Sequence, residues 1–329
     1  MAIIMPIYNA SHYLRRSIDS ILNQTFKNFD LYIQDDCSTD NTQQIIDEYI
    51  DERINYSRNN KNLGIAKSLN KVINRIWSAY EFIGRMDADD WSHPNRIKMQ
   101  VKFLDSNTQC VIVGTQGHWS KNFEQTNYSD WTYPENHDLI RYYLLFTACF
   151  GHSSVMIRSR IFRDHLVRYD EKIKTAEDWE FWTRLIKIGE MSNLSSFLMK
   201  YQIDDSSNHR ASKHKELHSM ETSKIISNYY RAFNLDFNNR DVYNFYSCKN
   251  KFDYEIFRKF IQSYNYLWHN YIKMESADVY ARMQYLFVRK IKKYLQTEGN
   301  LLLRVYYFLI LLVLVKFAPK RMILINYFK

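Results

Sequence analysis

The chain contains little glycine and little proline, with 7 and 4 residues respectively among 329. Collagen-like, linker-like and disordered chains need far more of these residues, so those classes are excluded. The four cysteines include no Cys-x-x-Cys pair and are widely spaced, at Cys37, Cys110, Cys149 and Cys248. This spacing argues against a zinc ribbon or a disulfide framework and favours reduced thiols in a cytoplasm.

The C-terminal region lacks an apolar run long enough to span a membrane. Val305–Val315 is an uncharged apolar stretch of 11 residues, whereas a spanning helix needs about 20. Residues 289–329 hold nine basic side chains and one acidic side chain, and so account for most of the net charge of +9. This tail predicts an interfacial helix on an anionic membrane, with a buried packing helix or an oligomer contact as the alternatives. The rest of the chain is nearly neutral, which argues against nucleic-acid binding.

Strand-like and helix-like patterns alternate through the first 115 residues. The expected strands are 3–7, 30–34, 54–57, 80–86 and 110–114. The expected helices between them are 13–22, 40–49, 63–76 and 94–104. Strands separated by helices of this length predict an α/β fold, with a single Rossmann-like, mostly parallel sheet.

The pattern changes after this alternation. Residues 119–138 are irregular and polar, which predicts a surface loop. Helix or strand signals return at 139–146, 152–158, 177–188 and 197–202, and the chain beyond about Ser212 predicts helices alone. We therefore expect a domain at 1–210 and a helical extension at 211–329, which ends in the basic, apolar tail at about 289–329.

An acidic cluster, Asp87-Ala88-Asp89-Asp90, follows the fourth expected strand. Ligands bind beyond the carboxyl ends of the strands in sheets of this kind. Adjacent carboxylates repel each other unless a cation neutralises them, and Mg²⁺ or Mn²⁺ takes carboxylate, phosphate and water oxygens. The cluster therefore predicts a metal site, and a solvated acidic turn is the alternative.

Two further strand ends carry polar groups. Asp35 and Asp36 follow the second strand, and their carboxylates can accept from a nucleobase N–H or a ribose hydroxyl. Pro6 and Tyr8 belong to the same edge, where the tyrosine ring could flank a base and the proline could simply punctuate the strand. Asp40 has a simpler interpretation as the cap of the following helix.

Glu177 and Asp178 open an aromatic helix, and one of them is the candidate general base that deprotonates an acceptor hydroxyl. Acids in a first turn also stabilise the helix dipole, so a structural role is the alternative. His152 fits an acceptor-side role and a structural hydrogen bond equally well. Asp204 and His209 could approach the metal, although a polar loop explains each of them as well.

These motifs together resemble family 2 glycosyltransferases with the A-type glycosyltransferase fold. The resemblance runs from Met1 to His209, about two-thirds of the chain, and its motifs are jointly specific. They are Ile4-Met5-Pro6-Ile7-Tyr8-Asn9, Ser20 to Phe26, Asp35 to Thr42, Asn62-Leu63-Gly64, Arg85 to Asp90, Pro94-Asn95-Arg96, Gln100, Gly151-His152-Ser153-Ser154 and Glu177-Asp178.

The resemblance implies a role for each site residue. It places the nucleoside of a nucleotide-sugar donor, usually a uridine, on Asp35, Asp36, Pro6 and Tyr8. It implies that Asp87 lies near the ribose or diphosphate and that Asp89 is the main protein ligand of Mn²⁺ or Mg²⁺. It further implies that Asp178 is the catalytic base of an inverting transfer, with Glu177 beside it. Arg85 is the first residue of the motif that contains the implied metal ligand, Asp89.

The chain departs from the family pattern at two positions. Cys37 stands where glycine is common, and Asp204 stands where many members carry a histidine, with His209 five residues later. The chain also lacks the Q-x-x-R-W motif and the membrane spans of processive synthases, which favours a single-addition hexosyl- or N-acetylhexosaminyltransferase.

The implied acceptor is a growing surface glycan such as capsule, O-antigen or lipooligosaccharide. Because such acceptors are lipid-linked, the tail predicts a peripheral location on the inner face of the cell membrane. A sugar nucleotidyltransferase is an alternative, but no Gly- and Lys/Arg-rich loop follows the first strand. A non-catalytic nucleotide-binding protein on the same fold is the other alternative.

Overall fold

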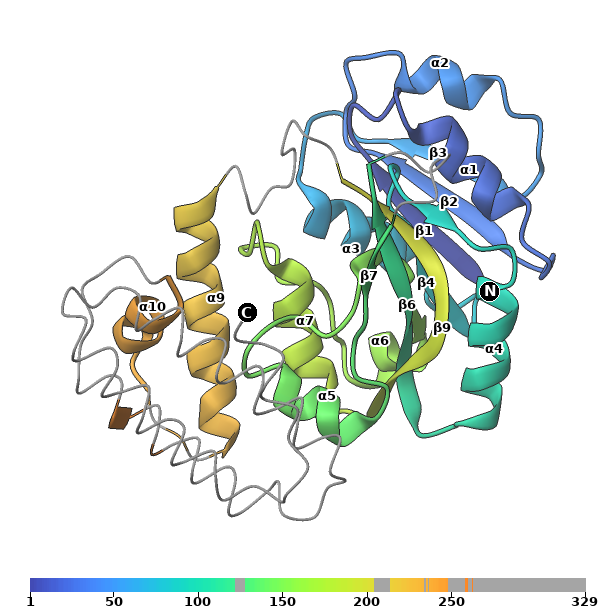
Figure 1. Cartoon of the computed structure of the whole chain (residues 1–329). Coiled ribbons are helices and arrows are strands. Elements are labelled where there is room, and N and C mark those ends of the chain that lie inside the picture. Colours follow the sequence, from blue (N-terminus) through green and yellow to red (C-terminus); the bar gives the residue numbers. More distant parts are fainter. Residues whose placement is uncertain are drawn as a thin grey trace. The chain divides into compact units, whose positions relative to one another are not determined.

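The computed structural model describes residues 1–121, 128–203, 214–233, 235, 237–247, 258–259 and 262. The chain divides into two compact units, Met1–His218 and Ser219–Lys329. Two candidate metal ligands, Asp204 and His209, and the basic tail at 289–329 lie outside the described residues (Figure 1). The metal-binding and membrane-binding roles predicted for these segments therefore stay predictions.

The first unit is built on one sheet. Its strands are β1 (Ala2–Ile7), β2 (Asp30–Asp35), β3 (Ile54–Arg58), β4 (Phe82–Arg85), β5 (Trp91–Ser92), β6 (Cys110–Ser120), β7 (Ser129–Trp131), β8 (Met156–Arg158) and β9 (Glu190–Gln202). The order in the sheet is β3-β2-β1-β4-β8-β6-β9-β5, and β7 pairs with β6. Because β3, β2, β1 and β4 are parallel, their carboxyl ends meet at one edge.

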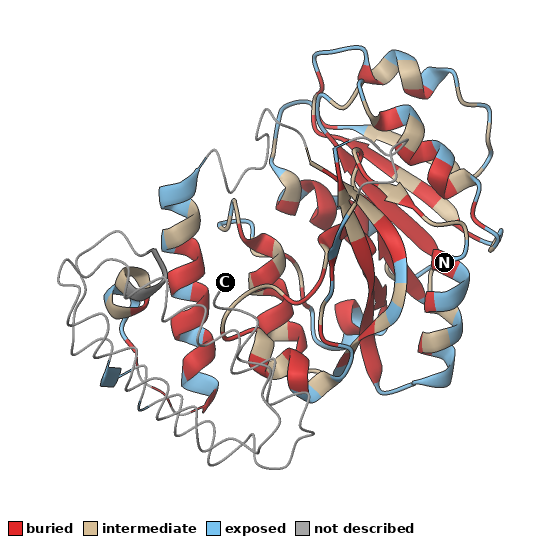
Figure 2. Ribbon diagram, in the orientation of Figure 1, coloured by how far each residue is buried: buried red, intermediate tan, exposed pale blue. Residues whose placement is uncertain are grey.

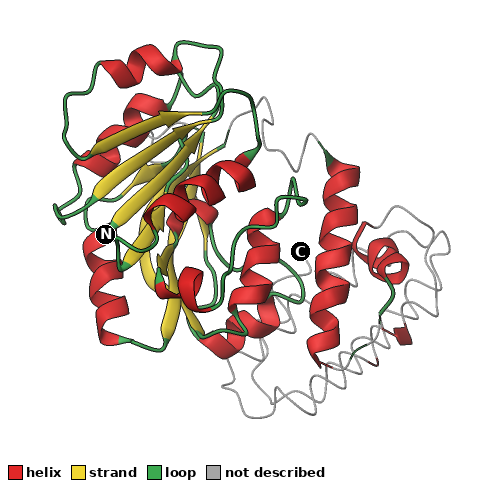
Figure 3. Cartoon of the chain, turned by 180° about the vertical axis from the view of Figure 1, so that it is seen from behind, coloured by secondary structure: helices red, strands yellow, loops and turns green. Residues whose placement is uncertain are grey.

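Helices cover both faces of this sheet, as the two opposite views show (Figures 1 and 3). They are α1 (Leu14–Leu22), α2 (Thr42–Asp47), α3 (Ile65–Ile76), α4 (Arg96–Ser106), α5 (His137–Tyr143), α6 (Arg160–Asp164) and α7 (Glu177–Leu185), with a 3₁₀ turn η1 (His152–Ser154). This arrangement confirms the predicted α/β class with a mostly parallel sheet.

Helix α1 shows how the sequence positions these layers. Leu14, Ile18 and Ile21 recur at helical spacing and are fully buried in the same core cluster as Ile3 and Met5 of β1. Burying each of these side chains stabilises the fold by about 1.5–3 kcal/mol relative to leaving it exposed. In the first unit, the buried sides of the helices face the sheet and their exposed sides face outwards (Figure 2).

The prediction of a surface loop at 119–138 is wrong in part. Strand β6 continues to Ser120, because it pairs in parallel with β9 as far as Gln202. Strand β7 and the first residues of α5 also fall within the predicted loop. Pairing with a strand far along the chain supplies the backbone hydrogen bonds that local sequence did not indicate.

The described elements beyond Ser212 are helical, as predicted. They are α9 (Lys215–Tyr230), which begins in the first unit, a 3₁₀ turn η2 (Arg231–Phe233) and α10 (Asn239–Ser247). Among all the helices that the structure describes, none combines the length and the apolar character needed to cross a membrane.

Candidate functional site

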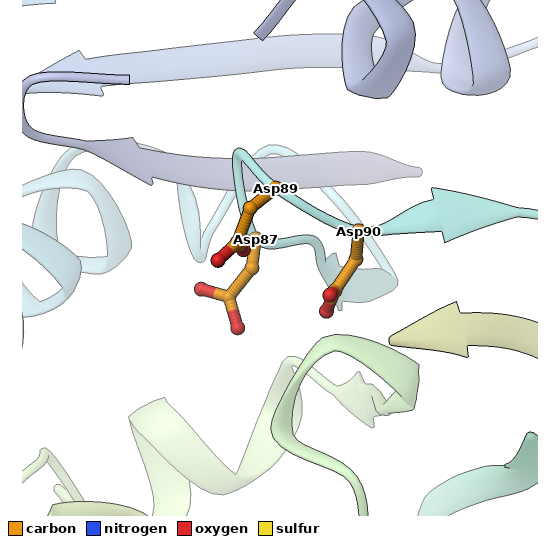
Figure 4. A group of neighbouring side chains, drawn as sticks. All are labelled: Asp87, Asp89 and Asp90. Carbon is orange, nitrogen blue, oxygen red and sulfur yellow. The ribbon is translucent and has the colours of Figure 1, made fainter. Parts of the chain in front are cut away.

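The acidic cluster lies at the carboxyl end of β4, in the turn that leads to β5. Carboxylate oxygens of Asp87, Asp89 and Asp90 all lie within 4.8 Å of one another (Figure 4). Ser17 of α1 holds the turn in place, because its hydroxyl donates to the carbonyl of Ala88 at 2.7 Å and lies 2.6 Å from that of Asp90. The helix that follows β1 therefore fixes the turn that follows β4.

The three carboxylates differ in what surrounds them. Asp90 is fully buried, and its two oxygens contact the backbone N–H of Gln202, at 3.1 Å, and the hydroxyl of Ser153. Burial raises the pKa of Asp90 well above its usual range, and the charges of Asp89 and Asp87 raise it further. The partners and the burial of Asp90 indicate a structural role for this carboxylate.

Asp87 and Asp89 are half-buried and are the outer members of the cluster. Asp87 forms an ion pair with Arg85 and accepts from the Ser153 hydroxyl at 2.7 Å. The pKa of Asp89 rises to about 6, first because of burial and then because of the nearby Asp87 charge. Oxygen ligands that repel one another in this way suit a hard divalent cation, so the donor set fits Mn²⁺ or Mg²⁺.

Two buried arginines lie behind the cluster. Arg85 donates to the Ser153 hydroxyl at 3.1 Å, and Arg96 donates to the carbonyls of Arg85 and Ser153. Burial lowers the pKa of Arg96 to about 9. Arg96 and Ser153 belong to motifs noted in the sequence, but no role was predicted for either. Because Arg96 and Ser153 lie far apart in the sequence, the sequence does not indicate that they are in contact.

Asp35 and Asp36 both have protein partners. Asp35 is fully buried and accepts from the backbone and hydroxyl of Ser38 at 2.8 and 2.7 Å, and from Tyr56 at 3.0 Å. Asp36 accepts from the backbone N–H groups of Leu63 and Gly64, both at 2.8 Å, at the entrance to α3. Both carboxylates therefore order the loops around the predicted nucleoside site, and their contact with a nucleoside stays a prediction.

The first strand end holds the other predicted nucleoside residues. Pro6 is buried within β1, whereas Tyr8 is 51% exposed just beyond it. Cys37 has φ of 68°, in the left-handed region where a side chain is disfavoured. This backbone conformation explains why glycine suits the position.

Asp178 lies in the first turn of α7 and is half-buried, while Glu177 beside it is buried. Asp178 accepts from the backbone N–H of Trp179 at 2.7 Å. Burial raises the pKa of Tyr169, on which charges from Asp178 and from Asp87 also act. Contacts link α7 to the acidic cluster through His152, whose ring packs against Trp182 of α7 and whose neighbour Ser153 donates to Asp87.

His152 is buried, and its Nε2 lies 2.9 Å from the hydroxyl of Tyr169. Its ring also meets the edge of Trp182, with centroids 5.8 Å apart. Of the two roles predicted for His152, this position supports the structural hydrogen bond.

Comparison with known proteins places these features in a family. The model of the family described as "Glycosyl transferase family 2" matches residues 2–166. An uncharacterized glycosyltransferase of Methanocaldococcus jannaschii is 31% identical over 237 residues, which cover 68% of this chain and 78% of the relative. The Escherichia coli protein WfgD, named as a UDP-Glc:alpha-D-GlcNAc-diphosphoundecaprenol beta-1,3-glucosyltransferase, is 29% identical over 224 residues, which cover 66% of this chain and 82% of WfgD.

Two solved structures share the fold. TarS of S. aureus (residues 1–349), in complex with UDP-GlcNAc, matches with a TM-score of 0.55 and 20% identity over 89% of this chain and 88% of TarS. The mannosyltransferase PcManGT of Pyrobaculum calidifontis, in complex with GDP-Man and Mn²⁺, matches with a TM-score of 0.53 and 13% identity. This match covers 96% of this chain and 85% of PcManGT. These matches confirm the expected A-type glycosyltransferase fold.

Proposed function

Because the chain belongs to glycosyl transferase family 2 and is therefore a glycosyltransferase, we propose that it transfers a hexosyl or N-acetylhexosaminyl group from a UDP-sugar to a glycan hydroxyl, with inversion. The observation that carries the proposal is the grouping of three carboxylates within 4.8 Å at the carboxyl end of β4. The UDP-sugars in the names of WfgD and the TarS complex support the choice of uridine.

On the donor side, Asp89 would be the main ligand of Mn²⁺ or Mg²⁺, and Asp87 would lie beside the ribose and diphosphate. The bound cation would neutralise charge on the diphosphate leaving group. Asp90 and Ser153 hold the turn from behind, and the ion pair with Arg85 orients Asp87. The Mn²⁺ in the PcManGT complex supports the metal.

On the acceptor side, Asp178 would remove the proton of the attacking hydroxyl. The hydroxyl oxygen bonds to the anomeric carbon as the bond from that carbon to the diphosphate breaks on the opposite face. One displacement of this kind inverts the anomeric configuration. A positioned carboxylate base contributes about 10²–10⁴ to such a rate.

The acceptor is proposed to be the lipid-linked precursor of a surface glycan, extended by one sugar at a time. The diphosphoundecaprenol in the name of WfgD supports this acceptor class. The basic, apolar tail at 289–329 would hold the enzyme at the inner face of the membrane, close to that acceptor.

A donor screen tests this function. Release of nucleotide from UDP-, GDP- and dTDP-sugars is measured with Mn²⁺, with Mg²⁺ and with excess EDTA. We expect turnover of a UDP-sugar that EDTA abolishes and Mn²⁺ restores. Asp178→Asn should lower the rate of nucleotide release. Asp105→Asn, at an exposed position in α4, should leave that rate unchanged. Turnover of no nucleotide-sugar under any condition would refute the proposal.

A further inference from the structure

Two adjacent residues of α1 hold the backbone of the acidic turn. The guanidinium of Arg16 donates to the carbonyl of Asp89 at 2.6 Å. The hydroxyl of Ser17 contacts the carbonyls of Ala88 and Asp90, on either side of Asp89. Three successive carbonyls of the turn are therefore held by one helix, and the middle one is held by a charged group.

Gln202, the last residue of β9, orients this guanidinium. The same nitrogen of Arg16 lies 3.1 Å from the side-chain oxygen of Gln202, which is only 4% exposed. The amide nitrogen of Gln202 donates to the carbonyls of Lys121 at 2.9 Å and Ile203 at 3.1 Å, so its oxygen faces Arg16. Its backbone N–H also donates to the carboxylate of Asp90 at 3.1 Å. One residue therefore orients Arg16 and holds the neighbouring acid.

The contact with Arg16 distinguishes Asp89 from the other two acids. The three carboxylate side chains leave the turn on the same side (Figure 4). Asp87 and Asp90 are oriented through their carboxylates, which both contact Ser153. Asp89 is held through its backbone carbonyl instead. A residue held in this way can offer its carboxylate to a cation without giving up the contact.

The fold itself does not require a guanidinium at this position. A fully buried apolar face already anchors α1 in the core. Arg15, the preceding residue, forms an ordinary surface ion pair with Glu48 at 2.7 Å, and both side chains are more than half exposed. Arg16 is half-buried and directed at the turn instead. Its position therefore has a closer connection with the acidic cluster than with the stability of the helix.

Groups that orient a metal-binding side chain from behind typically change metal affinity about 10–100-fold when they are removed. We propose that Arg16, oriented by Gln202, is a positioning residue that fixes the peptide of Asp89 and so directs its carboxylate to the cation. This inference rests on the proposed function, in which Asp89 is the main metal ligand.

Mn²⁺ binding by the full chain tests this role without turnover. Electron paramagnetic resonance measures the free Mn²⁺ at a fixed UDP concentration, against a blank that contains UDP alone. Arg16→Gln removes the guanidinium. Arg15→Gln is the matched control, because it removes the same charge from the adjacent residue of the same helix. Asp89→Asn reports whether the measured Mn²⁺ depends on the proposed ligand.

We expect Arg16→Gln to raise the Mn²⁺ dissociation constant about 10–100-fold, and Arg15→Gln to leave it within about twofold. The direction of the change separates positioning from charge, because removal of a positive charge alone would favour a bound cation and lower the constant. Arg16→Lys keeps the charge and can still donate to the Asp89 carbonyl, so its constant should lie between those of the wild type and Arg16→Gln.

The inference is overturned if Arg16→Gln binds Mn²⁺ as tightly as Arg15→Gln does, even where its Tm falls, because a purely structural role has that result. If Arg16→Gln does not fold, equal Mn²⁺ constants for Arg16→Lys and Arg15→Lys overturn it. Binding that is lost in Asp89→Asn and unchanged in Arg16→Gln refutes the role of Arg16 alone. Binding that is unchanged in Asp89→Asn refutes the metal site of the proposed function, and the inference with it.

Discussion

Ser153 offers a test of how the acidic cluster is held together. Its hydroxyl donates to Asp87 at 2.7 Å, accepts from Arg85 at 3.1 Å and also contacts the buried Asp90. Ser153→Ala removes these three contacts together with the bond that the hydroxyl accepts from the backbone N–H of Asp87 at 3.2 Å, and it leaves charged groups in a buried site without this partner. A hydrogen bond to a charged group contributes about 1.5–3 kcal/mol, and two such losses that are not fully additive give about 3 kcal/mol.

Ser154→Ala is the matched control for this loss. The Ser154 hydroxyl is equally buried, but its partners are neutral, because it donates to the carbonyl of Gly151 at 2.7 Å and accepts a long bond from the backbone N–H of Thr115 at 3.4 Å. Loss of a neutral hydrogen bond should cost about 1 kcal/mol. In a domain of this size each kcal/mol lowers Tm by about 2–4 °C. We therefore expect Tm to fall by about 6–12 °C for Ser153→Ala and by about 2–4 °C for Ser154→Ala.

Thermal unfolding followed by circular dichroism measures both variants, and urea unfolding gives the free energies separately. Nucleotide release should also decrease in Ser153→Ala, because the orientation of Asp87 depends on the same hydroxyl. Equal loss of stability in the two variants would show that Ser153 does not hold the charged cluster and would refute this reasoning.

Three further predictions concern the site and the packing of Trp131. Asp178→Asn should lower kcat for transfer about 10²–10⁴-fold and leave UDP binding, measured by calorimetry with Mn²⁺, unchanged; normal transfer would rule Asp178 out as the base. Asp89→Asn should weaken the activation of transfer by Mn²⁺ more than Asp105→Asn does. Equal activation curves for the two variants would show that Asp89 is not the main metal ligand. Gly117→Ala should destabilise the fold by about 1–3 kcal/mol in urea unfolding, because the new methyl group meets Trp131. A neutral effect would show that the indole is not confined there.

Most of the fold of the first 115 residues could be predicted because every element there except β5 carries its own apolar pattern. Helix α1 shows an apolar stripe at helical spacing, and β1 and β2 are short buried runs. Strand β5 has only two residues, and β7 only three, so neither contains enough sequence for a pattern. Their pairing with β9 and β6 comes from tertiary contacts instead.

The acids of the site could be predicted because each of them follows a strand or opens a helix. Their partners could not be predicted, because Ser153 lies 66 residues from Asp87, and Gln202 lies 112 residues from Asp90. The same limit applies to Asp36, whose bonds to the loop before α3 are not evident from its position after β2. Local sequence indicates which groups are present, and only the fold shows which of them meet.

The stereochemistry of donor cleavage tests the central claim most directly. Proton NMR follows the anomeric signals while the full chain hydrolyses a UDP-α-hexose, UDP-glucose or UDP-N-acetylglucosamine, in the presence of Mg²⁺. The account predicts that the β-anomer of the free sugar appears first, that EDTA prevents its formation and that Asp178→Asn slows it strongly. First appearance of the α-anomer, or cleavage that depends on neither the cation nor Asp178, would contradict an inverting transfer at this site.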